Sequence, residues 1–234
     1  MLKSVRRRVA GAAALALMLA GTFGPAAQAA PTPEQLVFEQ PFLAAFEPGA
    51  SISYRFSRVA DDANLAPSFE DVVTLNVVKP DDARDGGKAA VVQLFSGRKA
   101  RSFGPMPVTY NPVVLVLLEQ DVVEMQKVLG GSPYYIRGRI RDALTSAEKV
   151  EEVKVDYKGQ SIDAWSIKVS PFVKDPNRAK LKDFADRTYE ITYSDKVPGG
   201  LYAIHTVTPK AGAATPLLVE TLTVTGEGET GAKP

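Results

Sequence analysis

The segment NPVVLVLLEQDVVEMQKVLGGSPYYIRGRIRDALTSA, residues 111–147, decides the fold class. Its apolar residues have helical spacing, whereas those on both sides of it have strand spacing. Asn111-Pro112 suits the start of a helix, with Asn as the N-cap and Pro at the first helical position. Gly130-Gly131 suits its end. Between them, apolar residues recur at steps of three and four and mark one buried helix face: Leu115, Leu118, Val122, Met125 and Leu129.

A second helix is predicted directly after the first. Ser132-Pro133 repeats the start signal, and Ile136, Ile140 and Leu144 share one helical face. A strand across residues 134–140 is the alternative, because apolar residues also alternate there. The Ser-Pro start and the four-residue spacing favour the helix, so the segment predicts a pair of antiparallel helices.

Strand patterns stand on both sides of this helical hairpin. Ile52, Tyr54 and Phe56 alternate with polar residues, as expected of a half-buried strand. Successive strand patterns separated by short turns favour antiparallel pairing. We therefore predict a single α+β domain, a curved antiparallel sheet of about eight or nine strands covered by the helical hairpin and short helices. Further strand patterns fall at residues 71–78, 89–95, 153–157, 162–169, 189–193, 201–208 and 217–225.

Two short helices and one irregular stretch complete the predicted domain, residues 30–225. Thr32 and Gln35 form a capping box at the first short helix, and Asp175-Pro176 starts the second. Residues 98–110, with two prolines, show no regular pattern. Residues 226–234 are polar and predict a disordered tail.

The first 29 residues have the three parts of a secretory signal peptide. Four basic residues come first, an apolar run follows from Val9 to Phe23, and Ala27-Gln28-Ala29 provides a cleavage site after Ala29. Ordinary Sec export is favoured over the twin-arginine route, because no large apolar pair follows the arginines. The alternative to a cleaved signal peptide is that this segment stays on the protein as an uncleaved membrane anchor. We expect an exported, periplasmic protein.

Composition excludes several classes of site. The chain has no cysteine, which excludes disulfides, thiolate zinc sites and cysteine nucleophiles, and its single histidine excludes His-rich metal sites. After residue 29 it carries 24 basic and 27 acidic residues, an unfavourable balance for nucleic-acid binding. The acidic stretch 81–86 lacks the spacing of a calcium loop and is better interpreted as a solvated turn. We expect no metal and no cofactor.

His205 is the one candidate for acid–base catalysis, but no nucleophile motif accompanies it. The strand pattern places it on the same face as Leu201, Ala203 and Val207. A strand histidine with its hydrogen bonds satisfied is the preferred interpretation, and we assign no catalytic residue. A hydrolase using carboxylates near His205 is the least favoured function.

Two basic clusters offer a contact with a membrane surface, or are simply solvated faces, which is the favoured interpretation. One comprises Arg98, Lys99 and Arg101. In the other, Arg137 and Arg141 share a helix face, while Arg139 points away and is expected to pair with Asp142.

Aromatic and apolar residues on the inner faces of these elements give the best indication of function. A curved sheet partly closed by helices leaves an apolar cavity in many ligand-binding proteins, while a tightly packed core is the alternative. The candidate cavity residues are Tyr54, Phe56, Phe95, Leu118, Val122, Met125, Trp165, Tyr189 and Tyr193.

The order of these elements resembles that of the periplasmic lipoprotein-carrier class, comprising LolA- and LolB-like and LppX-like proteins. The segment YEITYSDKVPGG, residues 189–200, looks like the late strand–turn–strand of that class, whereas the long helical hairpin departs from it. The hairpin itself resembles exported proteins of alphaproteobacteria. The resemblance implies binding or carriage of a lipid or hydrophobic ligand without catalysis. The alternative is an envelope scaffold that docks a protein partner.

Overall fold

The computed structural model describes residues 30–80, 87–147 and 149–228, and their strands form one open antiparallel sheet. The strand order is β4-β3-β2-β1-β9-β8-β7-β6-β5, so the last strand inserts between the first and the eighth. This nine-stranded sheet with a few helices confirms the predicted α+β class. The strands are β1 (Ser51–Ala60), β2 (Phe69–Val78), β3 (Ala89–Leu94), β4 (Arg101–Met106), β5 (Glu151–Tyr157), β6 (Gln160–Val169), β7 (Thr188–Tyr193), β8 (Leu201–Thr208) and β9 (Leu218–Glu227).

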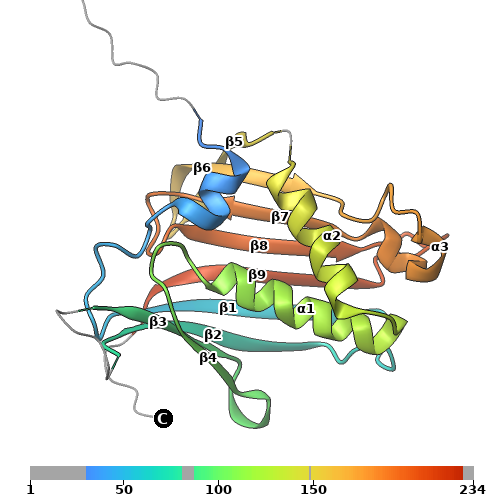
Figure 1. The fold of residues 1–234 in the computed structure, drawn as a ribbon, viewed down its shortest axis with the longest axis horizontal. Helices are drawn as coiled ribbons and strands as arrows, with labels where there is room; N and C mark the ends of the chain where they lie inside the picture. Colours follow the sequence, from blue (N-terminus) through green and yellow to red (C-terminus); the bar gives the residue numbers. More distant parts are fainter. Residues whose placement is uncertain (1–29, 81–86, 148, 229–234) are drawn as a thin grey trace, which may run out of the picture. The chain divides into compact units, whose positions relative to one another are not determined.

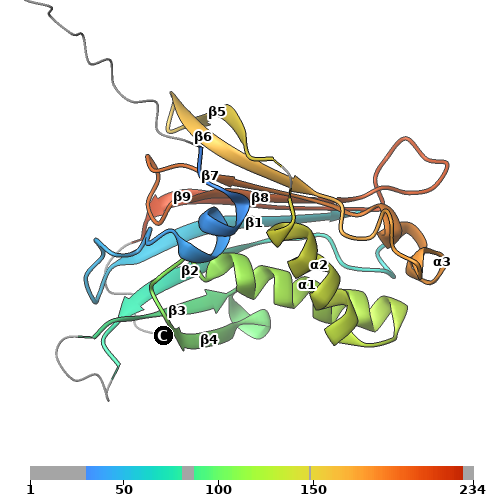
Figure 2. The ribbon, with the colours of Figure 1, turned by 45° about the horizontal axis from the view of Figure 1, so that its top comes forward.

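The helical hairpin covers one face of this sheet. Figure 1 shows α1 (Val113–Leu129) and α2 (Pro133–Thr145) in front of the central strands, and Figure 2 shows the sheet bending around them. The helical interpretation of residues 134–140 is therefore right and the strand alternative is wrong. The shorter helices are η1 (Gln35–Glu39), η3 (Gly97–Lys99), α3 (Arg178–Leu181) and η4 (Lys182–Asp186).

Side chains bond to backbone amides near the predicted starts of η1 and α1, whereas Ser132 makes no side-chain cap at α2. The backbone N–H of Gln35 donates to Thr32 Oγ1 at 3.2 Å, and the backbone N–H of Thr32 donates to Gln35 Oε1 at 2.9 Å. These two bonds form the predicted capping box. At α1, the Val113 amide donates to Asn111 Oδ1 at 3.1 Å. Asn111 also donates to Tyr54 and to the Gly199 carbonyl, so it ties the start of α1 to the core.

The core lies between the helices and the covered face of the sheet. Strand register places apolar side chains opposite one another in rows across this face. One row runs through five strands, and all its members are buried: Phe56, Leu222, Ile204, Ile191 and Ile167. These rows pack against the apolar stripe of α1, including Val122 and Met125.

Strand β4 lies inside the stretch predicted to be irregular, and that prediction is wrong. Its residues are mostly exposed and include Gly104 and Pro105, so no apolar alternation marks it. An edge strand needs hydrogen bonds on one side only, here from β3, and it therefore tolerates proline.

Strand β9 continues through Glu227, two residues beyond the predicted end of the domain. The predicted signal peptide, the acidic stretch 81–86 and residues 229–234 lie outside the described residues. Within the described part, no helix has the length and apolarity needed to span a bilayer.

Candidate functional site

A row of polar side chains crosses the centre of the covered face, next to the apolar row. Strand register aligns Tyr189, Thr206, Glu220 and Arg58 on β7, β8, β9 and β1. All four are buried, with relative exposures of 8% or less. Arg187, immediately before β7, is fully buried beside them. Buried charge is costly unless it is paired. Arg58 and Arg187 both pair with Glu220 of this row, and the remaining partners come from a helix.

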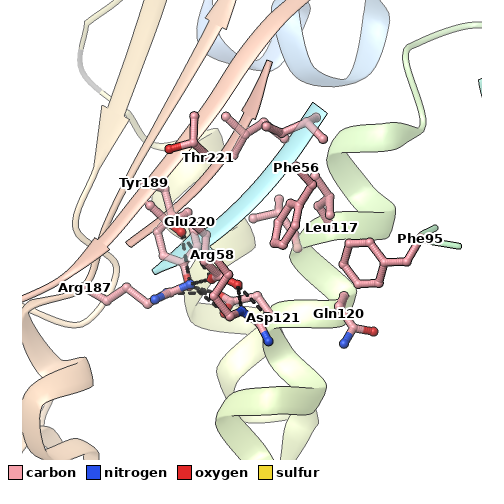
Figure 3. A pocket seen from close by; sticks show the side chains of 14 residues that line it. Phe56, Arg58, Phe95, Leu117, Gln120, Asp121, Arg187, Tyr189, Glu220 and Thr221 are labelled. Carbon is pink, nitrogen blue, oxygen red and sulfur yellow. Dashed lines mark hydrogen bonds and ion pairs between the residues drawn. The ribbon is translucent and has the colours of Figure 1, made fainter. Parts of the chain in front are cut away.

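Helix α1 supplies those partners. Arg187 Nε and Nη2 donate to the two carboxylate oxygens of Asp121 at 3.1 and 2.8 Å. Arg58 Nε donates to Glu220 Oε1 at 2.8 Å, and its Nη2 also donates to Glu124. Figure 3 shows Arg58, Asp121, Arg187 and Glu220 converging from helix and sheet. We call this set the buried ionic cluster: Arg58, Asp121, Glu124, Arg187 and Glu220.

Burial and the neighbouring charges shift the pKa values of the buried ionic cluster in opposing directions. Burial alone acts to lower the pKa of Arg187, but the carboxylates of Asp121 and Glu220 outweigh it and raise that pKa. Burial acts to raise the pKa of Glu220, but the two arginines outweigh it and lower that pKa. For Asp121, burial and the nearby Glu220 charge raise the pKa against the attraction of Arg187. Glu220 is therefore a carboxylate held between two guanidinium groups.

The space above the buried ionic cluster is too small for a substrate. Its volume is about 30 Å³, enough for one or two water molecules. Phe56, Phe95, Leu118 and Tyr189 line it together with Asp121. This space therefore offers no room for an organic ligand, and the cluster beside it fixes α1 on the sheet.

A much larger apolar hollow lies between the helical hairpin, β4 and η1. Its volume is about 480 Å³, within the range of small-molecule sites. We call it the apolar hollow. Its apolar lining residues are Phe38, Phe103, Met106, Leu115, Val116, Leu118, Val122, Ile140 and Leu144.

Charged side chains of this hollow come from both helices. Arg137 Nε and Nη2 donate to the two carboxylate oxygens of Glu119 at 2.7 and 2.6 Å. Arg141 also lines the hollow, and its side chain is 72% exposed. Its contact with Asp142 is long, at 3.9 Å. The apolar hollow therefore has one neutralised ion pair and one largely free guanidinium.

Four of the predicted cavity residues lie at one of these spaces beside α1, and one lies at both. Val122 lines the apolar hollow, Leu118 lines both spaces, and Phe56, Phe95 and Tyr189 line only the small one. The other predicted residues line neither space. They pack in the core, with Trp165 at its partly exposed border: Tyr54, Met125, Trp165 and Tyr193.

Most residues that line the apolar hollow were not predicted as cavity residues from the sequence. Phe103 and Met106 lie on the strand that the sequence did not reveal. Leu115, Ile140 and Leu144 were recognised as a helix stripe, which indicates burial but does not separate core from ligand contact. Leu115 is half-buried at the apolar hollow and outside the buried core.

His205 lies on the face of the sheet opposite the helices and is half-buried. Its Nδ1 is 3.0 Å from Thr221 Oγ1, while its cross-strand neighbour Glu190 accepts a hydrogen bond from Ser166. These bonds do not link a nucleophile, an imidazole and an acid in sequence. Leu201 is on the covered face instead, because the register shifts at Thr192/Tyr193, so its predicted face is wrong.

Arg139 has a different partner from the predicted one. Its Nε donates to Asp175 Oδ2 at 2.8 Å, and Asp142 instead lies near Arg141. Asp175 also accepts from Tyr135 at 2.7 Å. The second basic cluster is therefore largely neutralised. Among the described residues, no group of three or more His, Asp or Glu side chains has a geometry suited to a metal ion.

No protein-family model matches the chain, and no curated protein matches it. The structure is weakly similar to that of the lipoprotein LppX of Mycobacterium tuberculosis, at 13% identity and a TM-score of 0.32, over 76% of this chain and 86% of that one. It is also weakly similar to a chain of the Pseudomonas aeruginosa MucA/MucB complex, at 16% identity and a TM-score of 0.29, over 82% and 56%. Scores this low support no inference about a ligand or a partner.

Proposed function

We propose that this protein binds a ligand with an acyl chain in the apolar hollow and carries it without chemical change. The observation that carries the proposal is a space of about 480 Å³ walled by apolar side chains. Burying an acyl chain there removes apolar surface from water on both partners, at roughly 0.8 kcal/mol per methylene group.

The charged residues of the apolar hollow favour an anionic ligand over a neutral one. Glu119 and Arg137 neutralise each other through two hydrogen bonds. Arg141 has only the long contact with Asp142 and keeps most of its charge available. An acyl chain with an acidic head group fits this arrangement, with its chain on the apolar wall and its head near Arg141.

The proposed compartment is the periplasm, after removal of residues 1–29. This part of the proposal stands on the basic, apolar and Ala-x-Ala segments of the leader. Amino-terminal sequencing of the protein from the periplasmic fraction is expected to begin at Ala30. An intact amino terminus would contradict it.

Leu115 provides a direct test of the apolar hollow. It contacts the space while contributing little to the core, so Leu115→Trp and Leu115→Glu should fold. The first fills the hollow and the second places a charge on its wall. We expect both to weaken binding of a fluorescent fatty acid at least tenfold. Organic extraction of the wild-type protein, followed by mass spectrometry, should yield bound lipid.

Val72→Trp is the matched control, because Val72 is 49% exposed on a strand and lines none of the spaces described above. It should bind the fatty acid as the wild type does. Absence of extracted lipid together with absence of fatty-acid binding would overturn the proposal. Equal binding by the wild type and both Leu115 variants would overturn the assignment to this hollow.

A further inference from the structure

A separate hollow with a basic lining lies between η3, the start of β4 and the second half of α1. Its volume is about 250 Å³. Five basic side chains and one acidic side chain line it, and we call it the basic hollow. The charged members are Arg58, Arg98, Lys99, Arg101, Lys127 and Glu124.

Most of this positive charge is not compensated. Glu124, the acidic residue of the lining, is already bound by Arg58. Arg98, Lys99, Arg101 and Lys127 are exposed, and within the described part of the chain none of them forms an ion pair. The carboxylate of Asp71 interacts electrostatically with Lys99, but it accepts hydrogen bonds from Ser96 and does not line the basic hollow.

Aromatic rings form part of the wall of the basic hollow. Phe69 and Phe95 meet edge to face, with ring centroids 5.2 Å apart. Lys99 Nζ lies 3.6 Å from the Phe69 centroid, and the Arg58 guanidinium lies 5.1 Å from it. An apolar wall behind the cations excludes water and strengthens their attraction for an anion in the hollow.

We propose that the basic hollow binds a phosphate-class oxyanion. Two of its free cations are arginines, whose planar guanidinium groups bind phosphate oxygens in pairs. Several uncompensated charges around one space suit a multiply charged anion better than a single carboxylate. The site does not depend on the apolar hollow, and it goes beyond the proposed function.

The source of the phosphate group is a lipid head group or a free phosphate. Arg101 and Phe103 occupy the same face of β4, two residues apart, or about 7 Å along the strand. Phe103 lines the apolar hollow and Arg101 lines the basic one. A single phospholipid could therefore place its phosphate in the basic hollow and its acyl chain in the apolar hollow.

The test measures binding of two probes to the full mature chain. Inorganic phosphate is titrated by calorimetry, and phosphatidylcholine vesicles with and without phosphatidylglycerol are tested by co-sedimentation. Arg98→Gln/Arg101→Gln removes two exposed cations without touching the core. Because each basic side chain near an anionic surface contributes about fivefold, we expect a loss of roughly 30-fold.

Lys149→Gln/Lys154→Gln is the matched control, since both lysines are exposed and paired elsewhere, with Glu151 and Asp163. Binding of inorganic phosphate that the arginine pair loses and the control keeps supports a free-phosphate source. The same pattern with vesicles that contain phosphatidylglycerol, and no binding of inorganic phosphate, supports a lipid source. The proposal is overturned if neither probe binds, if the arginine variant binds like the wild type, or if the control loses as much. Because fatty-acid binding is not measured here, failure of this test leaves the result at Leu115 unaffected.

Discussion

Arg187 and Asp121 form a buried ion pair that joins α1 to the sheet: Arg187 Nη2 lies 2.8 Å from Asp121 Oδ1, and the arginine is fully buried. Asp121 lies between Leu118 and Val122, the two helix residues that the sequence proposed and the apolar hollow uses. The ion pair therefore fixes the helix that forms one wall of that hollow. The binding proposed for the apolar hollow therefore depends on α1 staying at this position.

Removal of the Arg187 guanidinium should be strongly destabilising. Arg187→Met leaves the Asp121 and Glu220 carboxylates buried without their shared cation, which costs about 3–5 kcal/mol. Urea unfolding measures this loss. Arg178→Met is the control, because the Arg178–Asp186 pair is nearly half exposed and contributes at most about 1 kcal/mol. Equal losses for the two variants would contradict the role assigned to the buried pair.

The sequence revealed the strands whose apolar residues alternate and the helices that begin with Asn-Pro and Ser-Pro. It missed β4 because an exposed edge strand with Gly104 and Pro105 needs neither apolar alternation nor hydrogen bonds on both sides. The apolar hollow depends on that strand through Phe103. The sequence therefore indicated only the helical side of the lining, through the apolar stripes of α1 and α2.

The buried ionic cluster was missed for a different reason. Arg58 and Glu220 are 162 residues apart in the chain, and a charged residue by itself indicates solvent exposure. One signal was present, since Asp121 interrupts the apolar stripe of α1 between Leu118 and Met125. Arg58 likewise continues the inward alternation of Tyr54 and Phe56. Which charges pair is determined by strand register and helix placement, which local patterns do not specify.

Two buried tyrosines should respond oppositely to loss of their hydroxyl groups. Tyr54 OH accepts a hydrogen bond from Asn111 at 2.9 Å, whereas Tyr193 OH is buried with no partner among the described residues. Tyr54→Phe should lower the free energy of unfolding by about 1–3 kcal/mol, because it leaves an Asn111 donor short of a partner. Tyr193→Phe should leave it unchanged or raise it, because an unpaired buried hydroxyl is removed. Urea unfolding of the two variants measures both effects, and a larger loss for Tyr193→Phe would contradict the assignment.

Stability should fall steeply at alkaline pH. Burial raises the pKa of Tyr54, Tyr189 and Tyr193 in the folded protein, whereas the unfolded chain titrates near pH 10. The stabilisation from these neutral hydroxyls is complete below about pH 10, and it is lost as pH rises toward the folded-state pKa values. Ionisation of these three tyrosines in the unfolded chain should lower the free energy of unfolding by roughly 4 kcal/mol between about pH 8 and about pH 11.

Urea unfolding across this range measures the alkaline loss, and tyrosinate absorbance of the native protein provides an independent check. Tyr193→Phe should reduce the loss by about a third, because one of the three groups is removed. Native tyrosines that all ionise together near pH 10 would contradict the prediction.

Gly200→Ala should destabilise the protein through a steric clash as well as through backbone strain. Gly212→Ala serves as the control that measures backbone strain alone. Gly200 and Gly212 both have positive φ, at 73° and 74°, so a left-handed conformation costs Gly200→Ala and Gly212→Ala alike, about 1 kcal/mol. A Cβ at Gly212 meets open space, whereas one at Gly200 would lie 2.2 Å from the Phe42 ring. Phe42 stacks on Tyr193 with ring centroids 5.8 Å apart, so it has little freedom to move aside. Gly200→Ala should therefore lose a further 1–3 kcal/mol or so in urea unfolding, and equal losses at the two positions would show that the Phe42 contact is easily relieved.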